Sequence, residues 1–239
     1  MIITTVIPTY NEAENLPKLV SALFALPMPD LRILVVDDNS PDGTGQLAED
    51  LAKEHPGRIS VLHRPGKMGL GSAYIQGFQR ALADGAEAVL QMDADFSHPV
   101  DRIPVLAQTL NDYDFVIGSR YIQGGAVDTN WPVWRKWLSG FGNVYARTIL
   151  GMQIRDVTGG FKLWCAATLQ RMPLERIRSN GYIFQVEMNY VATRLGFRSA
   201  EIPIYFADRR WGKSKMNFRI QIEAALRTWT LLGMYKDLK

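Results

Sequence analysis

Two aspartates, Asp93 and Asp95, are the residues whose type and spacing most clearly suggest chemistry. They follow the mostly apolar run 89–92, the pattern of a buried parallel strand that ends in charge. Side chains at i and i+2 of an extended strand share a face, so the two carboxylates can point the same way. Two anions that close repel unless a cation lies between them, and hard oxygen ligands suit Mg²⁺ or Mn²⁺. The same residues could equally cap a following helix, because Asp and Ser are common N-caps and Pro99 suits a first turn.

The composition is that of an ordinary globular protein. The chain has 239 residues, of which 47% are hydrophobic and 21% are charged, and no Pro/Gly/Ser-rich linker divides it. We therefore expect a single domain, residues 1–239. The single cysteine, Cys165, rules out an internal disulfide and favours a reducing compartment. No hydrophobic run approaches the roughly 20 residues of a membrane span, and no signal-peptide pattern is present, so we expect a cytosolic or membrane-surface protein.

Strands and helices alternate through the first half of the sequence. Apolar runs predict strands at 2–8, 32–36, 59–62, 89–92 and 114–118, and segments with helical spacing follow the first four of them. This alternation implies right-handed βαβ units and a mostly parallel sheet with helices on both faces, which is a Rossmann-like α/β architecture. The polar residues after the strands would then meet at one edge of the sheet, where open α/β sheets bind ligands.

Two further turns in this half hold candidate binding residues. Asp37 and Asp38 follow a buried-strand pattern and would reach the ligand-binding edge, although residues 40–43 are also typical of a turn and helix cap. The glycine-rich segment 66–71 could bind phosphate through backbone N–H groups. That match is weak, because Tyr74 replaces the small residue of the dinucleotide fingerprint and no Walker lysine motif is present.

After residue 118 the pattern is less regular, and Lys and Arg gather there, which favours anionic partners. An amphipathic helix is expected over residues 131–150, with Trp134, Trp137, Leu138, Phe141, Val144, Tyr145 and Ile149 on one stripe. Such a stripe is more often core than membrane surface, but Trp and Tyr beside basic residues also suit an interface with anionic lipid. Residues 201–206 predict a late edge strand because they contain Pro203. A basic loop, 209–215, and a final amphipathic helix over 222–232 follow.

Three more polar residues are candidates from their chemistry. Arg135 could bind a phosphate group, since guanidinium makes bidentate contacts, or it could form a surface ion pair. Gln185 and Glu187 could contact a polar ligand such as a sugar, or they could lie on the surface of a helix.

Six motifs occur together and in order. They are PTYNE (8–12), VDDNSPDGT (36–44), DAD (93–95), GSRY (118–121), DVTGGFK (156–162) and the basic loop RRWGKSK (209–215). Jointly they resemble the inverting family 2 glycosyltransferases of the GT-A fold, and most closely the polyprenol- or dolichol-phosphate mannose synthases. The resemblance covers nearly the whole chain. The first motif and the Asp-x-Asp element mark only the broad family, whereas residues 156–162 and 209–215 point to the polyprenol-phosphate branch.

The resemblance implies a role for particular residues. The nucleoside of the sugar donor would be held by Pro8, Tyr10, Glu12, Val36 and Asp38. Asp93 and Asp95, with the Ala94 backbone, would bind Mg²⁺ or Mn²⁺ and the donor diphosphate, and Arg120, Arg209 and Lys215 would contact phosphate or sugar oxygens. Residues 1–120 would form the nucleotide-sugar half of the domain, and residues 121–239 the acceptor- and membrane-facing half.

The implied reaction is inverting transfer of mannose from GDP-mannose to a polyprenyl or dolichyl phosphate, peripherally on the cytoplasmic face of a membrane and without nucleic acid. A phosphate monoester with a second pKa of about 6 is largely dianionic at neutral pH, so it needs no general base. A UDP-glucose-dependent glucosyltransferase with the same motifs is an open alternative. More remote alternatives are an Asp-x-Asp phosphatase of the haloacid dehalogenase type, whose motif usually opens its fold, and a binding module without turnover.

Overall fold

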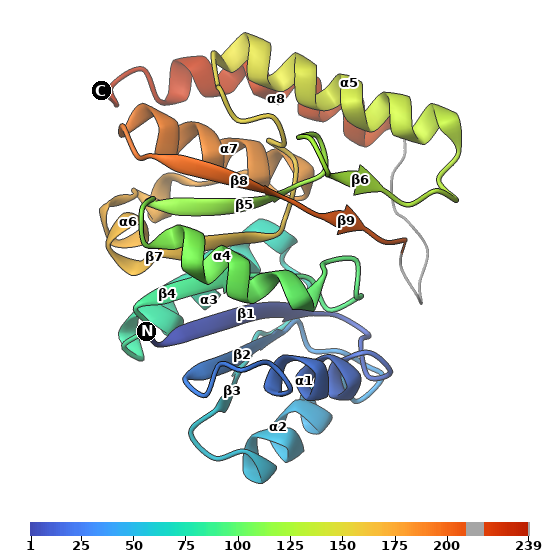
Figure 1. The fold of residues 1–239 in the computed structure, drawn as a ribbon, viewed down its shortest axis with the longest axis vertical. Coiled ribbons are helices and arrows are strands. Elements are labelled where there is room, and N and C mark those ends of the chain that lie inside the picture. Colours follow the sequence, from blue (N-terminus) through green and yellow to red (C-terminus); the bar gives the residue numbers. More distant parts are fainter. Residues whose placement is uncertain (209–217, 239) are drawn as a thin grey trace.

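The computed structural model describes residues 1–208 and 218–238, and its centre is a seven-stranded sheet (Figure 1). The strands are β1 (Ile3–Thr9), β2 (Leu31–Asp37), β3 (Ile59–His63), β4 (Ala88–Gln91), β5 (Phe115–Ser119), β7 (Lys162–Cys165) and β8 (Ser199–Pro203). They lie in the order β3-β2-β1-β4-β7-β5-β8. All neighbouring pairs are parallel except the two that involve β7, which is antiparallel to β4 and β5. The predicted mostly parallel sheet is therefore confirmed.

Helices cover both faces of this sheet. The helices of the described residues are α1 (Leu16–Phe24), α2 (Thr44–Glu54), α3 (Leu70–Ala83), α4 (Ile103–Leu110), α5 (Val133–Leu150), α6 (Ala166–Arg171), α7 (Tyr182–Arg194) and α8 (Phe218–Met234), with short 3₁₀ turns at Val100–Arg102 and Leu174–Arg176. Successive strand residues alternate between two buried clusters, as the twofold period of a strand requires. One cluster lies under α1, α2 and α4, and the other under α3 and α7.

The sequence pattern did not predict β7. This strand comes from the second half of the chain and inserts between β4 and β5, so the two halves share one sheet. Its first residue, Lys162, is completely buried. Buried strands are usually recognised by a continuous apolar run, and a charged residue interrupts that run. The expected strand over 201–206 is divided at Ile204 into the edge strand β8 and the short β9 (Tyr205–Phe206), which pairs with β6 (Ala126–Val127).

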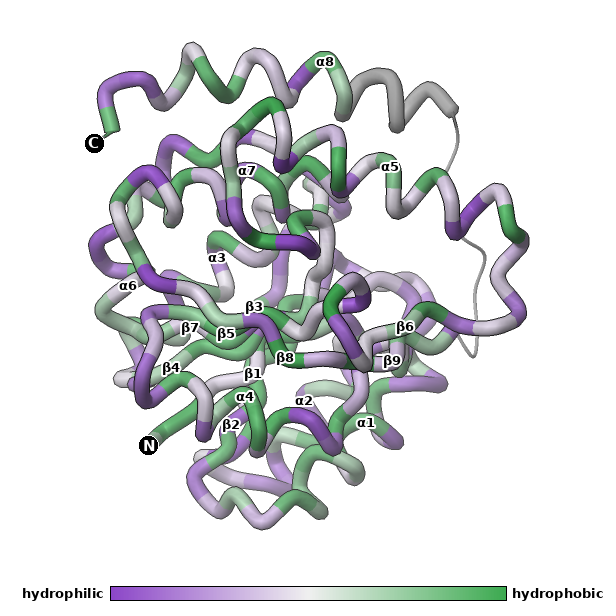
Figure 2. Tube along the Cα trace, turned by 45° about the horizontal axis from the view of Figure 1, so that its top comes forward, coloured by the Kyte–Doolittle hydropathy of each residue, from purple (hydrophilic) through white to green (hydrophobic). Residues whose placement is uncertain are grey.

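The amphipathic helices α5 and α8 lie together on the outside of the molecule, beyond α7 (Figures 1 and 2). The face of α5 that turns inward has small or polar residues, such as Asn143 and Ala146, and Asn143 bonds Thr158. Much of the stripe is therefore not covered by the core: Trp134, Trp137, Phe141 and Val144 are all exposed. The core interpretation of the stripe is wrong for these four residues, because helical periodicity does not say what covers the apolar side.

Among the described residues, no helix combines the length and the apolar composition that crossing a bilayer requires.

Candidate active site

The carboxyl ends of β1, β2 and β4 lie at one edge of the sheet. Thr9 at the end of β1 is in register with Asp37 at the end of β2. On the other side of β1, Val6 is in register with Gln91, so Asp93 leaves the sheet two residues beyond the end of β4. The fold thus brings together the motifs at 8–12, 36–44 and 93–95, as the alternating pattern predicted.

Hydrogen bonds to the backbone and to the carboxylates hold the loop that contains Asp93 and Asp95. The Asp93 backbone N–H donates to His98 Nδ1 at 3.0 Å, and Tyr74 Oη donates to Asp93 Oδ1 at 2.8 Å. Asp95 Oδ1 accepts from the Ser97 N–H at 3.1 Å and from Ser97 Oγ at 2.6 Å, which closes a tight turn. Burial lowers the pKa of His98, although the charges of Asp93 and Asp95 oppose this, and Nδ1 therefore stays available as an acceptor.

The helix-capping alternative for the two aspartates is wrong. The next helical turn begins at Val100, its N-cap residue is Pro99, and no side chain caps it. Instead, the chain turns back at Phe96, whose φ of 61° is in the left-handed region. Because this conformation is uncommon for a bulky residue, the loop is stabilised by its surroundings and not by local preference.

The donor set of this loop fits a divalent ion that binds together with a substrate. Within residues 1–208 and 218–238, no group of three or more His, Cys, Asp or Glu side chains could hold a metal ion alone. Mg²⁺ in proteins commonly takes one or two carboxylates and completes its octahedron with substrate phosphates and water. Asp93 and Asp95 supply that number of carboxylates, and Mn²⁺ accepts the same oxygen ligands.

The candidate nucleoside residues line the neighbouring part of the same edge. Asp38 Oδ1 lies 2.6 Å from Arg64 Nη1 in a buried ion pair, and Arg64 Nη2 also bonds Ser72 Oγ at 2.6 Å. Burial raises the pKa of Asp38 even though the Arg64 charge opposes the shift. Arg64 was not among the residues that the sequence predicted, since its partner lies 26 positions away.

The other residues predicted to bind the nucleoside lie in different surroundings. Lys67 Nζ lies 4.0 Å from the centroid of the Tyr10 ring, so this ring is near the glycine-rich segment. Glu12 accepts a hydrogen bond from Asn15 Nδ2 at 2.7 Å, and Pro8 lies within β1. The Val36 side chain is completely buried in the core, so only its main-chain atoms can be offered to a ligand.

Close packing explains why position 71 of the segment 66–71 is glycine, and this explanation requires no bound phosphate. A Cβ on Gly71 would collide with the Ser179 carbonyl oxygen, so glycine allows α3 to approach the loop before α7.

Arg120 and Asp156 form a second buried centre beyond the end of β5. The Arg120 Nε and Nη2 atoms each lie 2.7 Å from an Asp156 carboxylate oxygen, and Nη2 also donates to Thr158 Oγ1 at 2.8 Å. Burial alone would raise the pKa of Asp156, but the charge and hydrogen bonds of Arg120 outweigh it and hold that pKa below its ordinary value. Asp156 was part of a quoted motif, yet its pairing with Arg120 was not predicted.

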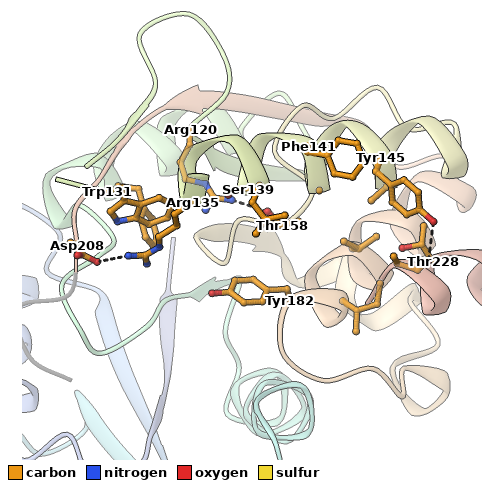
Figure 3. Close-up of a pocket in the computed structure, with 17 residues that line it drawn as sticks. Arg120, Trp131, Arg135, Ser139, Phe141, Tyr145, Thr158, Tyr182, Asp208 and Thr228 are labelled. Carbon is orange, nitrogen blue, oxygen red and sulfur yellow. Dashed lines mark hydrogen bonds and ion pairs between the residues drawn. The ribbon is translucent and has the colours of Figure 1, made fainter. Parts of the chain in front are cut away.

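A largely apolar pocket of about 200 Å³ opens beside Arg120, between α5, α7 and α8 (Figure 3). At one end, Arg135 lies 3.7 Å over the Trp131 ring and 3.3 Å from Asp208 Oδ1. Apolar side chains continue the lining toward the other end, among them Leu138, Phe141, Tyr145, Ile183 and Val186. Figure 3 shows Arg120 on the side of Trp131 and Arg135, away from Tyr145 and Thr228. The shape and lining therefore suit a ligand with an anionic head and a hydrocarbon tail.

The pocket and the aspartate loop are linked through two aromatic rings. His98, which accepts the Asp93 N–H, lies edge-on to Phe206 with ring centroids 5.7 Å apart. Phe206 lines the pocket, and the Arg120 guanidinium lies 5.2 Å from its ring centroid. The two predicted groups of site residues are thus parts of one region. Arg209 and Lys215 lie outside the described residues.

Gln185 and Glu187 are both buried, so the helix-surface interpretation is wrong for them. Gln185 Oε1 accepts from Gln91 Nε2 at 2.7 Å and from Lys162 Nζ at 2.9 Å. Glu187 accepts from the Ser179 N–H and from Tyr235 Oη. Burial lowers the pKa of Lys162 to about 7, and no sequence signal indicated this interior lysine.

Solved structures identify the fold as that of the GT-A glycosyltransferases. Mannosyl-3-phosphoglycerate synthase from Rubrobacter xylanophilus superimposes with a TM-score of 0.66 at 18% identity, over 100% of this chain and 76% of that one. The mannosyltransferase PcManGT from Pyrobaculum calidifontis, solved with GDP-Man and Mn²⁺, gives 0.59 at 17% identity, with the same coverage of 100% and 76%. The predicted fold class is confirmed.

The chain belongs to glycosyl transferase family 2, whose profile matches residues 4–178. It is 43% identical over 241 residues to the undecaprenyl-phosphate mannosyltransferase of Micrococcus luteus, covering 100% of this chain and 98% of that protein. It is 44% identical over 213 residues to the polyprenol monophosphomannose synthase of Mycolicibacterium smegmatis, covering 89% and 80%. The resemblance inferred from the motifs is confirmed, and the phosphatase alternative is not supported.

Proposed function

We propose that the protein transfers mannose from GDP-mannose to a polyprenyl phosphate and inverts the configuration at the anomeric carbon. The observation that carries this proposal is the apolar pocket with Arg120 and Arg135 along its wall. A polyprenyl phosphate has the matching chemistry, since it combines an anionic head with a long hydrocarbon chain. The two relatives named above are an undecaprenyl-phosphate mannosyltransferase and a polyprenol monophosphomannose synthase, and their names support transfer of mannose to a polyprenyl phosphate.

The donor would bind at the edge formed by the ends of β1, β2 and β4. Its nucleoside would contact Pro8, Tyr10, Glu12, Asp38 and the Val36 main chain. Asp93 and Asp95, with the Ala94 backbone, would hold Mg²⁺ or Mn²⁺ against the diphosphate. When bound, such an ion stabilises the negative charge of the leaving nucleoside diphosphate. The positive charges of Arg209 and Lys215 would contact phosphate or sugar oxygens, as the family resemblance implies.

The acceptor phosphate would lie against Arg120, whose position is fixed by Asp156 and Thr158. Among the described residues that line the pocket, Asp208 is the one carboxylate, and it is paired with Arg135. A hydroxyl acceptor would need a general base there, whereas a phosphate dianion attacks without one. The lining therefore favours a phosphate acceptor, and one displacement by its oxygen gives a β-linked product from an α-linked donor.

The exposed face of α5 would attach the protein to a membrane surface. Trp134 is 62% exposed and Trp137 is 72% exposed, and Lys136 and Arg147 lie on the same helix. Aromatic side chains at the headgroup level and cations beside anionic lipid both favour such peripheral binding. This attachment would place the open pocket near the lipid acceptor. We assign it to the cytoplasmic face, where a single reduced cysteine is expected.

The two halves of the domain would bind different ligands. Residues 1–120 would bind the nucleotide sugar, and residues 121–239 would bind the acceptor and the membrane. A panel of nucleotide sugars with a short polyprenyl phosphate tests the proposal directly. Release of GDP from GDP-mannose only when the acceptor is present would support it, and equal use of UDP-glucose would overturn the donor assignment.

A further inference from the structure

Two buried rings, Tyr74 and His98, contact Asp93 from different parts of the chain. Tyr74 lies on α3, nineteen positions before Asp93, and its hydroxyl donates to the carboxylate oxygen Oδ1 at 2.8 Å. His98 follows the loop, and its Nδ1 accepts the Asp93 backbone N–H at 3.0 Å. The relative exposures of Tyr74 and His98 are 0% and 2%, so neither ring can reorient without moving the core.

Each ring is in turn fixed by a second ring. Tyr74 stacks on Phe184 of α7 with centroids 5.8 Å apart and an interplanar angle of 1°. His98 stacks on Phe161 at 5.1 Å and 21°. Both phenylalanines are completely buried, so the hydroxyl and Nδ1 are presented at defined points.

A buried hydroxyl normally requires a partner, because leaving it without one costs free energy. A backbone carbonyl in the core could have accepted this hydrogen bond. A phenylalanine in place of the tyrosine would have removed the need for a partner. Here the partner is one of the two carboxylates that suit a divalent ion, and hydrogen bonds to a carboxylate are stronger than neutral ones. The backbone N–H of Asp93 also donates to His98, so hydrogen bonds hold both the backbone and the carboxylate of Asp93.

We propose that Tyr74 and His98 are positioning residues that set the orientation of the Asp93 carboxylate before the metal and donor bind. The inference rests on the function proposed above, in which Asp93 is a metal ligand. Neither ring contacts the reacting atoms. Groups that orient metal ligands typically change metal affinity or activity by about 10- to 100-fold when they are removed.

Tyr74→Phe is the sharpest test, because it removes one oxygen and keeps the ring that stacks on Phe184. Tyr235→Phe is the matched control: its ring is also completely buried, and its hydroxyl donates to a buried carboxylate, Glu187 Oε1, at 2.7 Å. Mn²⁺ affinity is measured by electron paramagnetic resonance, alone and with GDP, and the melting temperature is recorded for each variant. We expect Tyr74→Phe to weaken Mn²⁺ binding about tenfold and Tyr235→Phe to leave it unchanged.

A third variant, Asp93→Asn, separates this inference from the proposed function. If Asp93→Asn leaves Mn²⁺ affinity unchanged, the metal site itself is wrongly assigned. If Asp93→Asn weakens binding but Tyr74→Phe does not, the positioning role is overturned. The role is also overturned if Tyr74→Phe unfolds while Tyr235→Phe folds, since the hydroxyl would then serve the fold.

The role of His98 is tested by replacing it with side chains that place a hydrogen-bond acceptor at different positions. An Asn side chain places its amide oxygen near the position of Nδ1, whereas a Gln side chain reaches toward the position of Nε2. We expect His98→Asn to retain more Mn²⁺ affinity and a larger kcat than His98→Gln. Equal losses in both variants would contradict a role through the Asp93 N–H.

Discussion

The guanidinium of Arg120 is locked to the carboxylate of Asp156 by two hydrogen bonds of 2.7 Å inside the protein, although the two residues are 36 positions apart in the sequence. The Arg120 backbone N–H donates to the same carboxylate at 2.9 Å. Arg120 lines the pocket and Asp156 does not, so the residue proposed to contact the acceptor phosphate is held by a buried carboxylate outside the pocket lining.

Asp156→Asn should destabilise the protein and impair transfer, because it leaves the Arg120 charge buried without its partner. Breaking a buried pair costs about 3–5 kcal/mol of unfolding free energy. The loss is measured by urea denaturation at neutral pH. Asp84→Asn is the control, since it breaks the exposed pair with Arg80 and should cost under about 1 kcal/mol.

The same pair predicts a pH dependence. The pKa of Asp156 is lower in the folded protein than its ordinary value of 3.8, so its stabilising contribution is present above that value. It is lost as the pH falls below about 4 and the folded carboxylate is protonated. The difference in unfolding free energy between wild type and Asp156→Asn should therefore shrink in that range, and a constant difference would contradict the assignment.

Lys162 predicts that stability also rises with pH in a higher pH range. Its pKa in the folded protein is about 7 against an ordinary 10.5, so between these values the unfolded chain binds the extra proton and stability rises with pH. The rise attributable to Lys162 should be on the order of 3–5 kcal/mol. Denaturation of wild type and Lys162→Met at pH 7 and pH 10 checks this. A parallel rise in Lys162→Met would mean that other groups cause it.

Asp95→Asn should abolish transfer and leave the fold intact, because the neutral amide keeps the shape but loses the charge that attracts a cation. We expect kcat/KM to fall by at least about 100-fold, the upper end of the losses seen even for outer partners of metal ligands. Asp101→Asn changes an exposed aspartate of the same segment and should have full activity. Wild-type turnover in Asp95→Asn would refute the site assignment.

Replacing Trp134 and Trp137 with Ser should release the protein from anionic vesicles. Both side chains are exposed, so the variant should melt at the wild-type temperature. Wild type should sediment with vesicles at low salt and dissociate as salt rises, since charge contributes to binding. Tyr113→Ser is the control, because it removes an exposed aromatic ring far from α5 in the sequence. Unchanged sedimentation of the double variant would show that the stripe has another role.

The aspartate loop could be predicted because its signals are local. A mostly apolar run that is followed by Asp93 and Asp95 indicates a buried strand, and strands that alternate with helices place its carboxyl end at the edge of the sheet where ligands bind. The pairs Arg120–Asp156 and Asp38–Arg64 could not be predicted, since each depends on how distant segments pack. The strand β7 was missed because Lys162 disrupts its pattern, and only the tertiary contacts to Gln185 show why a lysine is tolerated there.

The stripe on α5 shows a different limit of sequence analysis. The spacing of Trp134, Trp137 and Phe141 correctly indicated a helix with one apolar side. Whether that side meets the core, a membrane or another molecule depends on the neighbouring elements, and the inward face of α5 is polar at Asn143.

The most direct test of the central claim is a comparison of two acceptors that differ only in the phosphate. The purified protein is incubated with GDP-mannose, Mg²⁺ or Mn²⁺, and either a short polyprenyl phosphate or the corresponding free polyprenol, and GDP release and the anomeric configuration of the product are measured. We predict a β-linked mannosyl phosphate and GDP release with the phosphate acceptor alone. Transfer to the free alcohol at a comparable rate would contradict the account, because it would require a general base, and the one carboxylate in the described lining of the pocket, Asp208, is paired with Arg135.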